Sequence, residues 1–476
     1  MRKLKLLLVL CVLAVGGAIL PANAYSTSDL TSAGWTNVTS ITDVNNYFYI
    51  FVDASAQETA MGRGASTTDK PRYIALANPV ETSSEVWVLE KTGDKYSIKS
   101  FTDAYYFNSA NNGWQDFCNP SKSSADFTFT LSDGKYQISN SSVTSYNTQS
   151  EGQYVGPWTN KTPSVNENIA CNKNINNTNG FYLYSIPRSA FLAKFLVNAS
   201  SSSEINLTAL IDHATITDAT PTGWTLTKDG GNNPAYNSSL FEIYNASSYT
   251  LQQTLSLIPG IYTLGVSGFY RAGGATGTAQ NSFLFMGDKE QAINNINAGG
   301  YDTAPGTGKW SDGNDSKKVP NDMAAAGYAI NTDSKYANTF YGIDVTTNSV
   351  ALGLKLSTHV SGDWTIFNYF TLKCTGVYLS AISEAFTSGS TMAAGQWYYY
   401  DIPTAGDYDF TSSDAATLTY TTDGTQLASG ATGTESIFTA AGTNKIALSA
   451  GRLYLKASAA TTLTVSNIYK VGSATP

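Results

Sequence analysis

The sequence predicts an all-β, multi-domain protein. The chain of 476 residues is long enough for about three domains of ordinary size. Only 13% of its residues are charged, about half the usual share, while it holds 30 Tyr and 40 Gly residues. Short stretches that alternate apolar and polar residues recur between polar turns, and few segments show the 3.6-residue period of a helix. Together these observations favour many short strands packed as sheets.

The first element is an export signal at residues 1–24. The stretch MRKLKLLLVLCVLAVGGAILPANA has a basic start, an apolar run and the small-x-small pattern of a cleavage site. We therefore expect a mature chain from Tyr25 that is secreted or held at the cell surface. Cys11 follows Leu10 within the apolar run, so we expect no lipobox. No later stretch reaches the ~20 apolar residues of a membrane span.

The next segment, residues 25–188, carries an internal repeat. VWVLEKTGDKYSIKSF and FTFTLSDGKYQISNSS align with Tyr96 on Tyr136 and Ile98 on Ile138, and GFYLYSIPR is a weaker third copy. Units of about 40 residues that cannot bury their apolar faces alone close with their copies. The repeat resembles that of a ricin-type β-trefoil, without clear copies of the Gln-x-Trp signature of that family. The resemblance implies a β-trefoil-like domain.

Two further boundaries follow from composition. Residues 189–204 combine a short apolar run with a serine tract, which is typical of a short helix or a linker. Residues 377–476 alternate in ATLTYTTDG, GRLYLKAS and TTLTVSNIY and are broken by Gly and Asp turns. We predict a small antiparallel β-sandwich there.

The middle segment, residues 205–376, holds GWTLT, FEIY, YTLQQTLSLIPGIYTLGVSGFYRAG and GDWTIFNYFTLKCTG in that order. The order and spacing resemble the galactose-binding-like jelly-roll module of surface and secreted proteins of Bacteroidetes. The resemblance implies a β-sandwich that binds carbohydrate. The family usually closes on Trp-x-x-Phe-Asp-Asn-Phe-Arg-Leu. This chain has Asn368, Tyr369 and Thr371 at the three polar positions, so a role carried by those family residues does not transfer.

The strand GIYTLGVSGFYR ends on the first candidate ligand-binding residues, Tyr270 and Arg271. With a period of two, Tyr262, Leu264 and Tyr270 share the core face, and Arg271 ends the opposite face. A sugar ring offers an apolar face to an aromatic side chain and paired hydroxyls to a guanidinium. The alternative is a core tyrosine beside a surface ion pair.

Three further residues of the middle segment are candidate ligand contacts: Glu242 on a strand, Trp310 in the long polar loop 299–322, and Tyr369. Alternation in the closing strand places Phe367 and Tyr369 opposite the core face of Trp364 and Ile366. For each of these candidates the alternative is a purely structural role. Trp114 and Trp158, in Asn-rich stretches of the N-terminal domain, are secondary candidates.

Metal sites and cofactors are not indicated. Asp312, Asn314 and Asp315 supply oxygen ligands but fail the EF-hand pattern, which leaves a structural calcium ion as an alternative. After removal of Cys11 the cysteines are Cys118, Cys171 and Cys374. A Cys118–Cys171 disulfide and free thiols both remain open.

The function predicted from the sequence is non-catalytic glycan binding. The net charge of −8 and the lack of basic clusters argue against nucleic acid as a partner. No nucleophile elbow, zinc-protease helix or phosphate loop is present. FYRAG resembles a strand of the alginate-lyase family, but the Gln-x-His and Arg-x-Glu strands of that family are absent. A polysaccharide lyase or glycosidase and a structural or adhesive surface protein are the alternatives.

Overall fold

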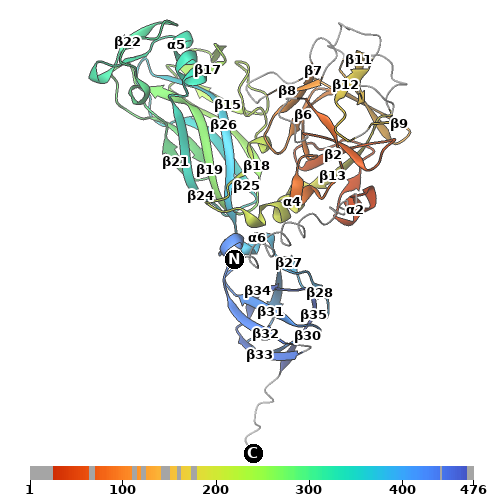
Figure 1. Cartoon of the computed structure of the whole chain (residues 1–476). Coiled ribbons are helices and arrows are strands. Elements are labelled where there is room, and N and C mark those ends of the chain that lie inside the picture. Colours follow the sequence, from red (N-terminus) through yellow and green to blue (C-terminus); the bar gives the residue numbers. More distant parts are fainter. Residues whose placement is uncertain are drawn as a thin grey trace, which may run out of the picture.

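The computed structural model describes residues 25–63, 70–109, 115–118, 125–140, 151–157, 162–163, 165–172, 179–439 and 442–468. The expected signal peptide lies outside these residues. The described chain is all-β, and its main sheets form three lobes, here called the N-terminal part (residues 25–187), the central part (205–377) and the C-terminal part (384–468) (Figure 1). These parts are defined by their sheets. The domain boundaries expected from the sequence remain a proposal.

The described strands of the N-terminal part form one 13-stranded sheet with the main order β12-β11-β10-β13-β2-β5-β6-β7-β8. They are β1 (Thr36–Asn37), β2 (Tyr47–Asp53), β3 (Thr59–Gly62), β4 (Arg72–Ala75), β5 (Trp87–Thr92), β6 (Lys95–Ser100), β7 (Tyr106–Ser109), β8 (Gln115–Cys118), β9 (Thr128–Ser132), β10 (Lys135–Ser139), β11 (Glu151–Pro157), β12 (Ile169–Asn172) and β13 (Phe181–Pro187).

The internal repeat corresponds to two hairpins of this sheet. Strands β5 and β6 pair antiparallel around a two-residue turn, and β9 and β10 do the same. Ile98 and Ile138, which the repeat aligns, are both fully buried in one hydrophobic cluster, and Phe181 of the third copy joins them. The repeat therefore marks β-trefoil-like units that share a core.

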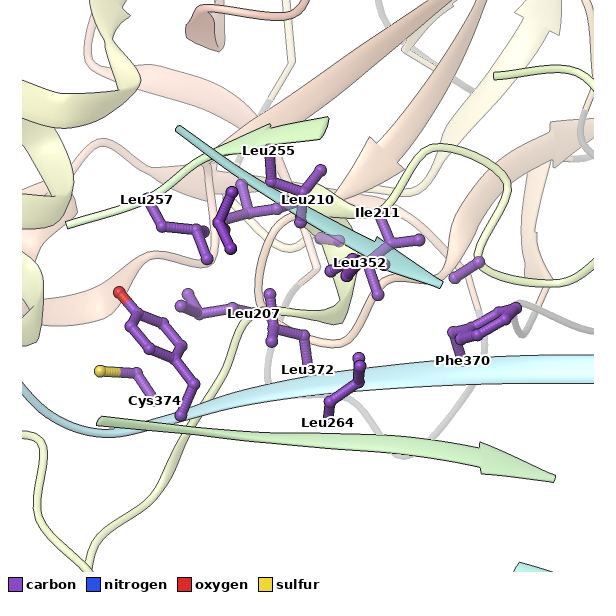
Figure 2. Packing of buried hydrophobic residues seen from close by; sticks show 14 of the residues in the cluster. Leu207, Leu210, Ile211, Leu255, Leu257, Leu264, Leu352, Phe370, Leu372 and Cys374 are labelled. Atoms are coloured by element: carbon purple, nitrogen blue, oxygen red, sulfur yellow. The ribbon is translucent and has the colours of Figure 1, made fainter. Parts of the chain in front are cut away.

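The central part is a sandwich of two antiparallel sheets. One has the order β16-β17-β26-β19-β24 with β14 on β26, and the other has the order β15-β18-β25-β20-β21. The strands are β14 (Ile205–Asn206), β15 (Thr225–Asp229), β16 (Ala235–Asn237), β17 (Leu240–Tyr244), β18 (Ser248–Ser256), β19 (Gly260–Arg271), β20 (Ser282–Met286), β21 (Lys289–Ala292), β24 (Ala337–Val345), β25 (Ser349–Leu356) and β26 (Trp364–Val377). Figure 2 shows Leu264 and Leu372 facing Leu352 across the sandwich, with Leu210 and Ile211 nearby.

A β-bulge in β26 changes which side chains reach the core. Val266 of β19 pairs with Phe370, but Gly268 pairs with Phe367, so β26 has one extra residue there. Phe367 consequently joins Phe370 in the sandwich core, whereas Trp364 packs in a second cluster on the other face. The strict alternation expected for this strand is wrong at Phe367 for that reason.

The C-terminal part has two smaller sheets, with the orders β27-β29-β34-β31-β32 and β28-β35-β30-β33. Their side chains enclose a separate core that includes Phe410, Leu418 and Leu455. The strands are β27 (Glu384–Ala385), β28 (Thr391–Met392), β29 (Trp397–Ile402), β30 (Gly406–Ser412), β31 (Ala416–Thr421), β32 (Thr434–Phe438), β33 (Gly442–Leu448), β34 (Gly451–Ala457) and β35 (Thr461–Ile468).

Helices in the described residues are few and short. They are α2 (Thr27–Ser32), α3 (Pro79–Thr82), α4 (Arg188–Phe195), α5 (Met323–Gly327) and α6 (Leu379–Ile382), with a π-helical turn at Tyr328–Thr332 and 3₁₀ turns at Leu196–Asn198, Thr208–Leu210, Ile296–Gly299, Asn314–Ser316 and Ala428–Gly430. No helix in the described ranges is long and apolar enough to cross a bilayer.

Helix α4 lies where the sequence indicates a short helix or a linker, and it is packed rather than extended. Phe191 is fully buried and makes edge contacts with Trp35, Phe48 and Phe101 of the N-terminal part. The cluster that contains Phe191 continues through the core of the central sandwich and reaches Trp397 of the C-terminal part. One continuous apolar core therefore joins all three parts.

Candidate functional site

Strand β19 sends its last two side chains to different environments. Tyr270 is fully buried in the sandwich core, as the core stripe of the sequence predicts. Burial, and secondarily the charge of Asp363, raises the pKa of Tyr270 to about 12. The buried hydroxyl makes no hydrogen bond of good geometry with the described residues, although Asn281 and Asp363 lie close enough to act on its pKa. Because the ring has no exposed face, Tyr270 cannot stack on a ligand in this conformation.

Arg271 lies at the surface on the opposite face. Its guanidinium carbon sits 4.6 Å from the centroid of the Trp364 ring. Nη1 donates to Oδ1 of the exposed Asn321 at 3.1 Å, while the buried Nε has no partner in the described part of the chain. Burial lowers the pKa of Arg271, and Tyr244 and Glu242 oppose this shift. An arginine remains a cation at neutral pH even so. Arg271 is thus a cation held in place by the Trp364 ring and by Asn321. Its Nη2 makes no hydrogen bond with the described residues.

Glu242 is connected to Arg271 through the same tryptophan. The indole Nε1 of Trp364 donates to Oε2 of Glu242 at 2.6 Å. The connection exists because β26 pairs with β17 on one side and with β19 on the other. The half-buried Glu242 therefore fixes the indole on which the guanidinium stacks, and its carboxylate retains further acceptor capacity.

The loop that carries Trp310 is tied to Arg271 through Asn321. Strands β22 (Trp310–Asp312) and β23 (Lys318–Pro320) pair, so Trp310 lies opposite Pro320. The next residue, Asn321, donates its backbone N–H to the carbonyl of Lys309 at 2.8 Å. The half-buried Trp310 ring packs edge-on against Tyr301 at 5.0 Å, and its Nε1 donates to the carbonyl of Thr307 at 2.7 Å.

These side chains form one surface at an end of the central sandwich, which we call the loop face. It combines polar groups with partly exposed aromatic rings, and its apolar base is the cluster that holds Phe269 and Trp364. Its members are Glu242, Tyr244, Arg271, Tyr301, Trp310 and Asn321. Figure 1 places β17, β22 and α5 together at this end.

Sequence reasoning missed three components of the loop face: Tyr244, Asn321 and the stacking role of Trp364. The order of strands in the sheet brings Tyr244 and Trp364 to Arg271 across roughly 120 residues of sequence between β17 and β26, whereas Asn321 is placed by the β22–β23 hairpin. The motif FEIY contained the only available signal, since it places a second polar-tipped ring two residues after Glu242.

Tyr369 lies elsewhere. It packs against the main core beside Thr208, and its pKa is raised to about 12 by burial, with Tyr105 and Asp103 of the N-terminal part contributing. The structure therefore places Tyr369 at the junction between parts and apart from the loop face.

Of the three proposed calcium ligands, the carboxylate of Asp312 is engaged by another group. Asp312 forms an ion pair with Lys318 across the β22–β23 hairpin. The backbone N–H of Asn314 donates to Oδ1 of Asn297 at 2.7 Å, and Asp315 has a left-handed backbone with φ 54°. In the described ranges no three His, Cys, Asp or Glu side chains gather as a metal site would require.

The remaining predictions concern residues that the structure describes in part or not at all. Trp114 and Trp158 lie outside the described residues. Cys118 and Cys171 are placed by their backbones, on β8 and β12, but their side chains lie outside the description, so their disulfide stays a prediction. Cys374 is a buried free thiol whose pKa burial raises to about 11.

Comparisons with known proteins give distant structural likenesses only. No protein-family model matches the chain, and no curated protein matches it. A Polyporus squamosus lectin solved with a human-type influenza-binding epitope is 14% identical over 30% of this chain and 50% of its own, with a TM-score of 0.24. A Macrolepiota procera ricin B-like lectin in complex with lactose is 10% identical over 31% of this chain and 98% of its own, with a TM-score of 0.24. A mosquitocidal holotoxin is 11% identical over 82% of this chain and 39% of its own, with a TM-score of 0.25.

This chain thus spans half the length of the Polyporus lectin. Likenesses this distant do not assign a function.

Proposed function

We propose that this chain is a secreted or surface-associated, non-catalytic carbohydrate-binding protein whose central part binds glycans at the loop face. The observation that carries the proposal is the Arg271 guanidinium, which is stacked on Trp364 and, among the described residues, donates only from Nη1, to Asn321, so that Nη2 is left for a ligand. A guanidinium in a fixed plane donates parallel hydrogen bonds to neighbouring hydroxyls. Its stack holds that plane before a ligand arrives, which reduces the entropy lost on binding.

The rest of the loop face supplies what a sugar requires. The carboxylate of Glu242 accepts hydrogen bonds from hydroxyls, and Asn321 both donates and accepts. The partly exposed rings of Tyr244, Tyr301 and Trp310 offer apolar surface to the C–H face of a pyranose at low entropy cost. Polar groups and rings on a rigid β-sandwich are the usual composition of a carbohydrate platform.

Affinity electrophoresis through gels that contain host or plant polysaccharides tests the proposal. We expect retarded migration of the chain from Tyr25 to Pro476, and Arg271→Ala to weaken retardation by about 10- to 100-fold, the range for a lost charge-assisted hydrogen bond. Trp310→Ala is expected to weaken it as well. Lys289→Ala is the matched control, because it removes one positive charge from the same sandwich, where, among the described residues, Lys289 forms an ion pair only with the exposed Asp288.

The outcomes separate this proposal from its alternatives. Unretarded migration in every gel would favour a structural or adhesive protein without a glycan site. Shortening of the polymer during the run would favour a lyase or glycosidase. Equal loss of retardation in Arg271→Ala and Lys289→Ala would mean that retardation depends on the net charge of the protein and not on the loop face.

A further inference from the structure

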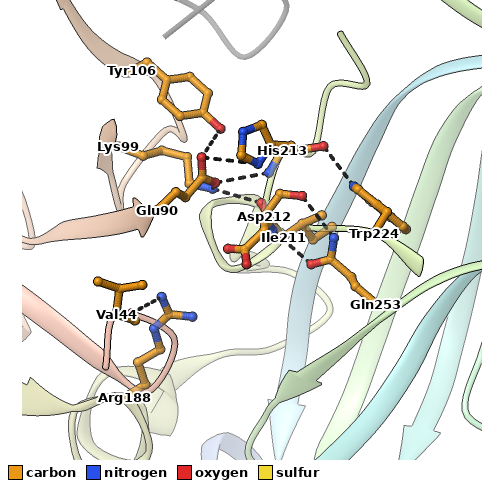
Figure 3. A network of polar contacts seen from close by, with 10 residues as sticks. All are labelled: Val44, Glu90, Lys99, Tyr106, Arg188, Ile211, Asp212, His213, Trp224 and Gln253. Carbon is orange, nitrogen blue, oxygen red and sulfur yellow. Dashed lines mark hydrogen bonds and ion pairs between the residues drawn. The ribbon is translucent and has the colours of Figure 1, made fainter. Parts of the chain in front are cut away.

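A buried polar cluster lies between the N-terminal and central parts (Figure 3). Glu90 of β5 forms an ion pair with Lys99 of β6, and the hydroxyl of Tyr106 on β7 donates to Oε2 of Glu90 at 2.8 Å. Burial alone would raise the pKa of Glu90, but Lys99 and then His213 outweigh it, so the pKa of this carboxyl lies below its ordinary value. Glu90 is therefore a buried, ionised and fully engaged acceptor.

The cluster holds a segment of the central part, residues 211–213. Lys99 Nζ donates to the carbonyl of Ile211 at 2.8 Å, and the backbone N–H of His213 donates to Oε1 of Glu90 at 3.1 Å. The amide of Gln253 clamps the backbone of Asp212 with bonds of 2.9 and 3.0 Å. Both backbone groups of Asp212 are thus fixed, which leaves its side chain as the part available to other molecules.

A cavity of about 320 Å³ opens beside this segment. That volume is at the lower end of the range for ligand sites, which suits one small residue rather than an extended chain. Its lining combines apolar and polar side chains from both parts, among them Ile41, Asp43 and Val44 from the N-terminal part and Asp212, His213 and Thr222 from the central part.

Two groups of this lining have hydrogen-bonding capacity that the described residues do not use. The carboxylate of Asp212 accepts no hydrogen bond from them, and the buried Nδ1 of His213 has no hydrogen-bond partner and lies 3.7 Å from Oε2 of Glu90. Asp43, in contrast, accepts from the backbone of Asn45 at 3.0 Å and from the side chain of Asn46 at 2.7 Å. Among the carboxylates that line the cavity, Asp212 is therefore the open acceptor.

The charges around the cavity favour a neutral ligand. The carboxylates Asp43, Glu90 and Asp212 are matched by the cations Lys91, Lys99 and Arg188, of which Arg188 acts on Asp212 electrostatically from α4. A balanced set gives little net attraction to an ion of either sign. Hydroxyl groups satisfy an open carboxylate without adding charge, and Ile41 and Val44 provide apolar contact.

We infer that this cavity between the parts is a second saccharide site, which takes one neutral, hydroxyl-rich sugar residue on the carboxylate of Asp212. The inference rests on the proposed glycan-binding function and adds a site that does not involve the loop face. Neighbouring hydroxyls of the sugar donate to the two carboxylate oxygens, and His213 Nδ1 and Thr222 complete the contacts at the wall.

The acid response of the site follows from the groups that face Asp212. Burial and then the charge of Glu90 raise its pKa, while Lys99, Arg188 and His213 lower it. A protonated carboxyl accepts fewer hydrogen bonds than a carboxylate. Binding at this site therefore weakens as the pH falls through the raised pKa of Asp212.

Saturation-transfer NMR with the chain from Tyr25 to Pro476 and methyl glycosides of glucose, galactose, mannose and N-acetylglucosamine tests the inference. At least one glycoside is expected to give a saturation-transfer signal. Asp212→Asn is expected to lower the affinity for that glycoside at least tenfold, and acidification is expected to weaken its binding to the wild type. Thr222→Tyr, which blocks the cavity from an exposed position, is expected to abolish the same signal. Asp229→Asn, at an exposed carboxylate of the same sandwich, is the matched control.

The loop-face variant separates the two claims. Arg271→Ala is expected to keep the Asp212-dependent signal, so failure of the loop face leaves this site standing. A signal from no glycoside, or one that survives both Asp212→Asn and Thr222→Tyr, overturns the second site even when polysaccharide retardation depends on Arg271. If Asp212→Asn lowers the thermal midpoint of the protein, its loss of binding has a second cause. The Thr222→Tyr variant alone then tests the second site.

Discussion

At the scale of single residues, neighbours on one strand have opposite roles. Tyr270 and Arg271 are adjacent in sequence, yet one is fully buried and the other reaches the loop face. The period of a strand gives this separation directly, since successive side chains point to opposite faces. The chemistry of a tyrosine therefore says little about binding until its face is known.

Tyr270→Phe is expected to leave glycan retardation unchanged and not to lower stability. The substitution removes a buried hydroxyl that makes no hydrogen bond of good geometry with the described residues, and an unsatisfied buried group costs about 1–3 kcal/mol. Urea denaturation together with affinity electrophoresis checks both expectations. Loss of retardation in a folded Tyr270→Phe protein would show that the hydroxyl contacts the ligand.

Asp212→Asn is expected to change the pH dependence of stability. The folded pKa of Asp212 is raised, so the native state binds more protons than the unfolded state between the unfolded pKa, about 3.9, and the folded pKa. The wild type therefore loses stability as the pH rises through that window, and the neutral amide does not. Urea denaturation from pH 4 to 8 should show the variant gaining relative stability with rising pH. A difference that is independent of pH would contradict the raised pKa.

At the scale of elements, the hydrogen-bonded pair Glu90 and Lys99 links a hairpin of the N-terminal part to the segment 211–213. Lys99→Met is expected to destabilise the protein by about 3–5 kcal/mol, because it leaves the carboxylate of Glu90 buried without its cation. Urea denaturation at pH 7 measures this loss. Lys95→Met on the same strand is the control, since in the described part of the chain Lys95 donates only to the hydroxyl of Thr128. A loss below about 1 kcal/mol would mean that the pair contributes little.

The elements also show what the sequence could predict. The two hairpins were visible because turn dipeptides and alternation are local signals, and Ile98 and Ile138 pack where the repeat places them. The bulge at Phe367 could not be predicted, because no residue type in the sequence marks where one strand has an extra residue relative to its partner. The Glu90–Lys99–His213 cluster was equally invisible, since its members come from two parts of the chain and meet only after both have folded.

The candidate site was predicted in the same partial way. Arg271, Glu242 and Trp310 come to one region, because strand ends and a long polar loop lie at the same end of the sandwich. Tyr369 does not, because the bulge and the packing of the N-terminal part place it at the junction. Partners that depend on sheet order, such as Trp364 under Arg271, require the fold.

At the scale of the whole molecule, the three parts pack against one another through one continuous hydrophobic core, so we expect them to behave as one rigid body. Phe191 of α4 lies in that core, so opening this segment exposes apolar surface from neighbouring parts. Thermolysin under native conditions is therefore expected not to cut between Arg188 and Ala199, whereas Phe191→Ala, with an expected cost of about 3–5 kcal/mol, becomes susceptible there. Fragment masses identify the cuts. Rapid cleavage of the wild type within this range would mean that the parts are joined by a flexible linker.

A rigid arrangement also suits two weak sites on one chain. The loop face and the cavity beside Asp212 lie on fixed elements, so a polysaccharide that reaches both gains affinity from the second contact without new ordering of the protein. The same rigidity is compatible with a purely structural protein, and only binding separates the two accounts.

Affinity electrophoresis of the wild type beside Arg271→Ala and Lys289→Ala is the sharpest test of glycan binding at the loop face. We expect retardation by at least one polysaccharide, an about 10- to 100-fold weakening in Arg271→Ala, and wild-type behaviour in Lys289→Ala. Retardation that Arg271→Ala leaves intact would contradict the assignment of the loop face. Free migration of all three proteins in every gel would contradict glycan binding itself.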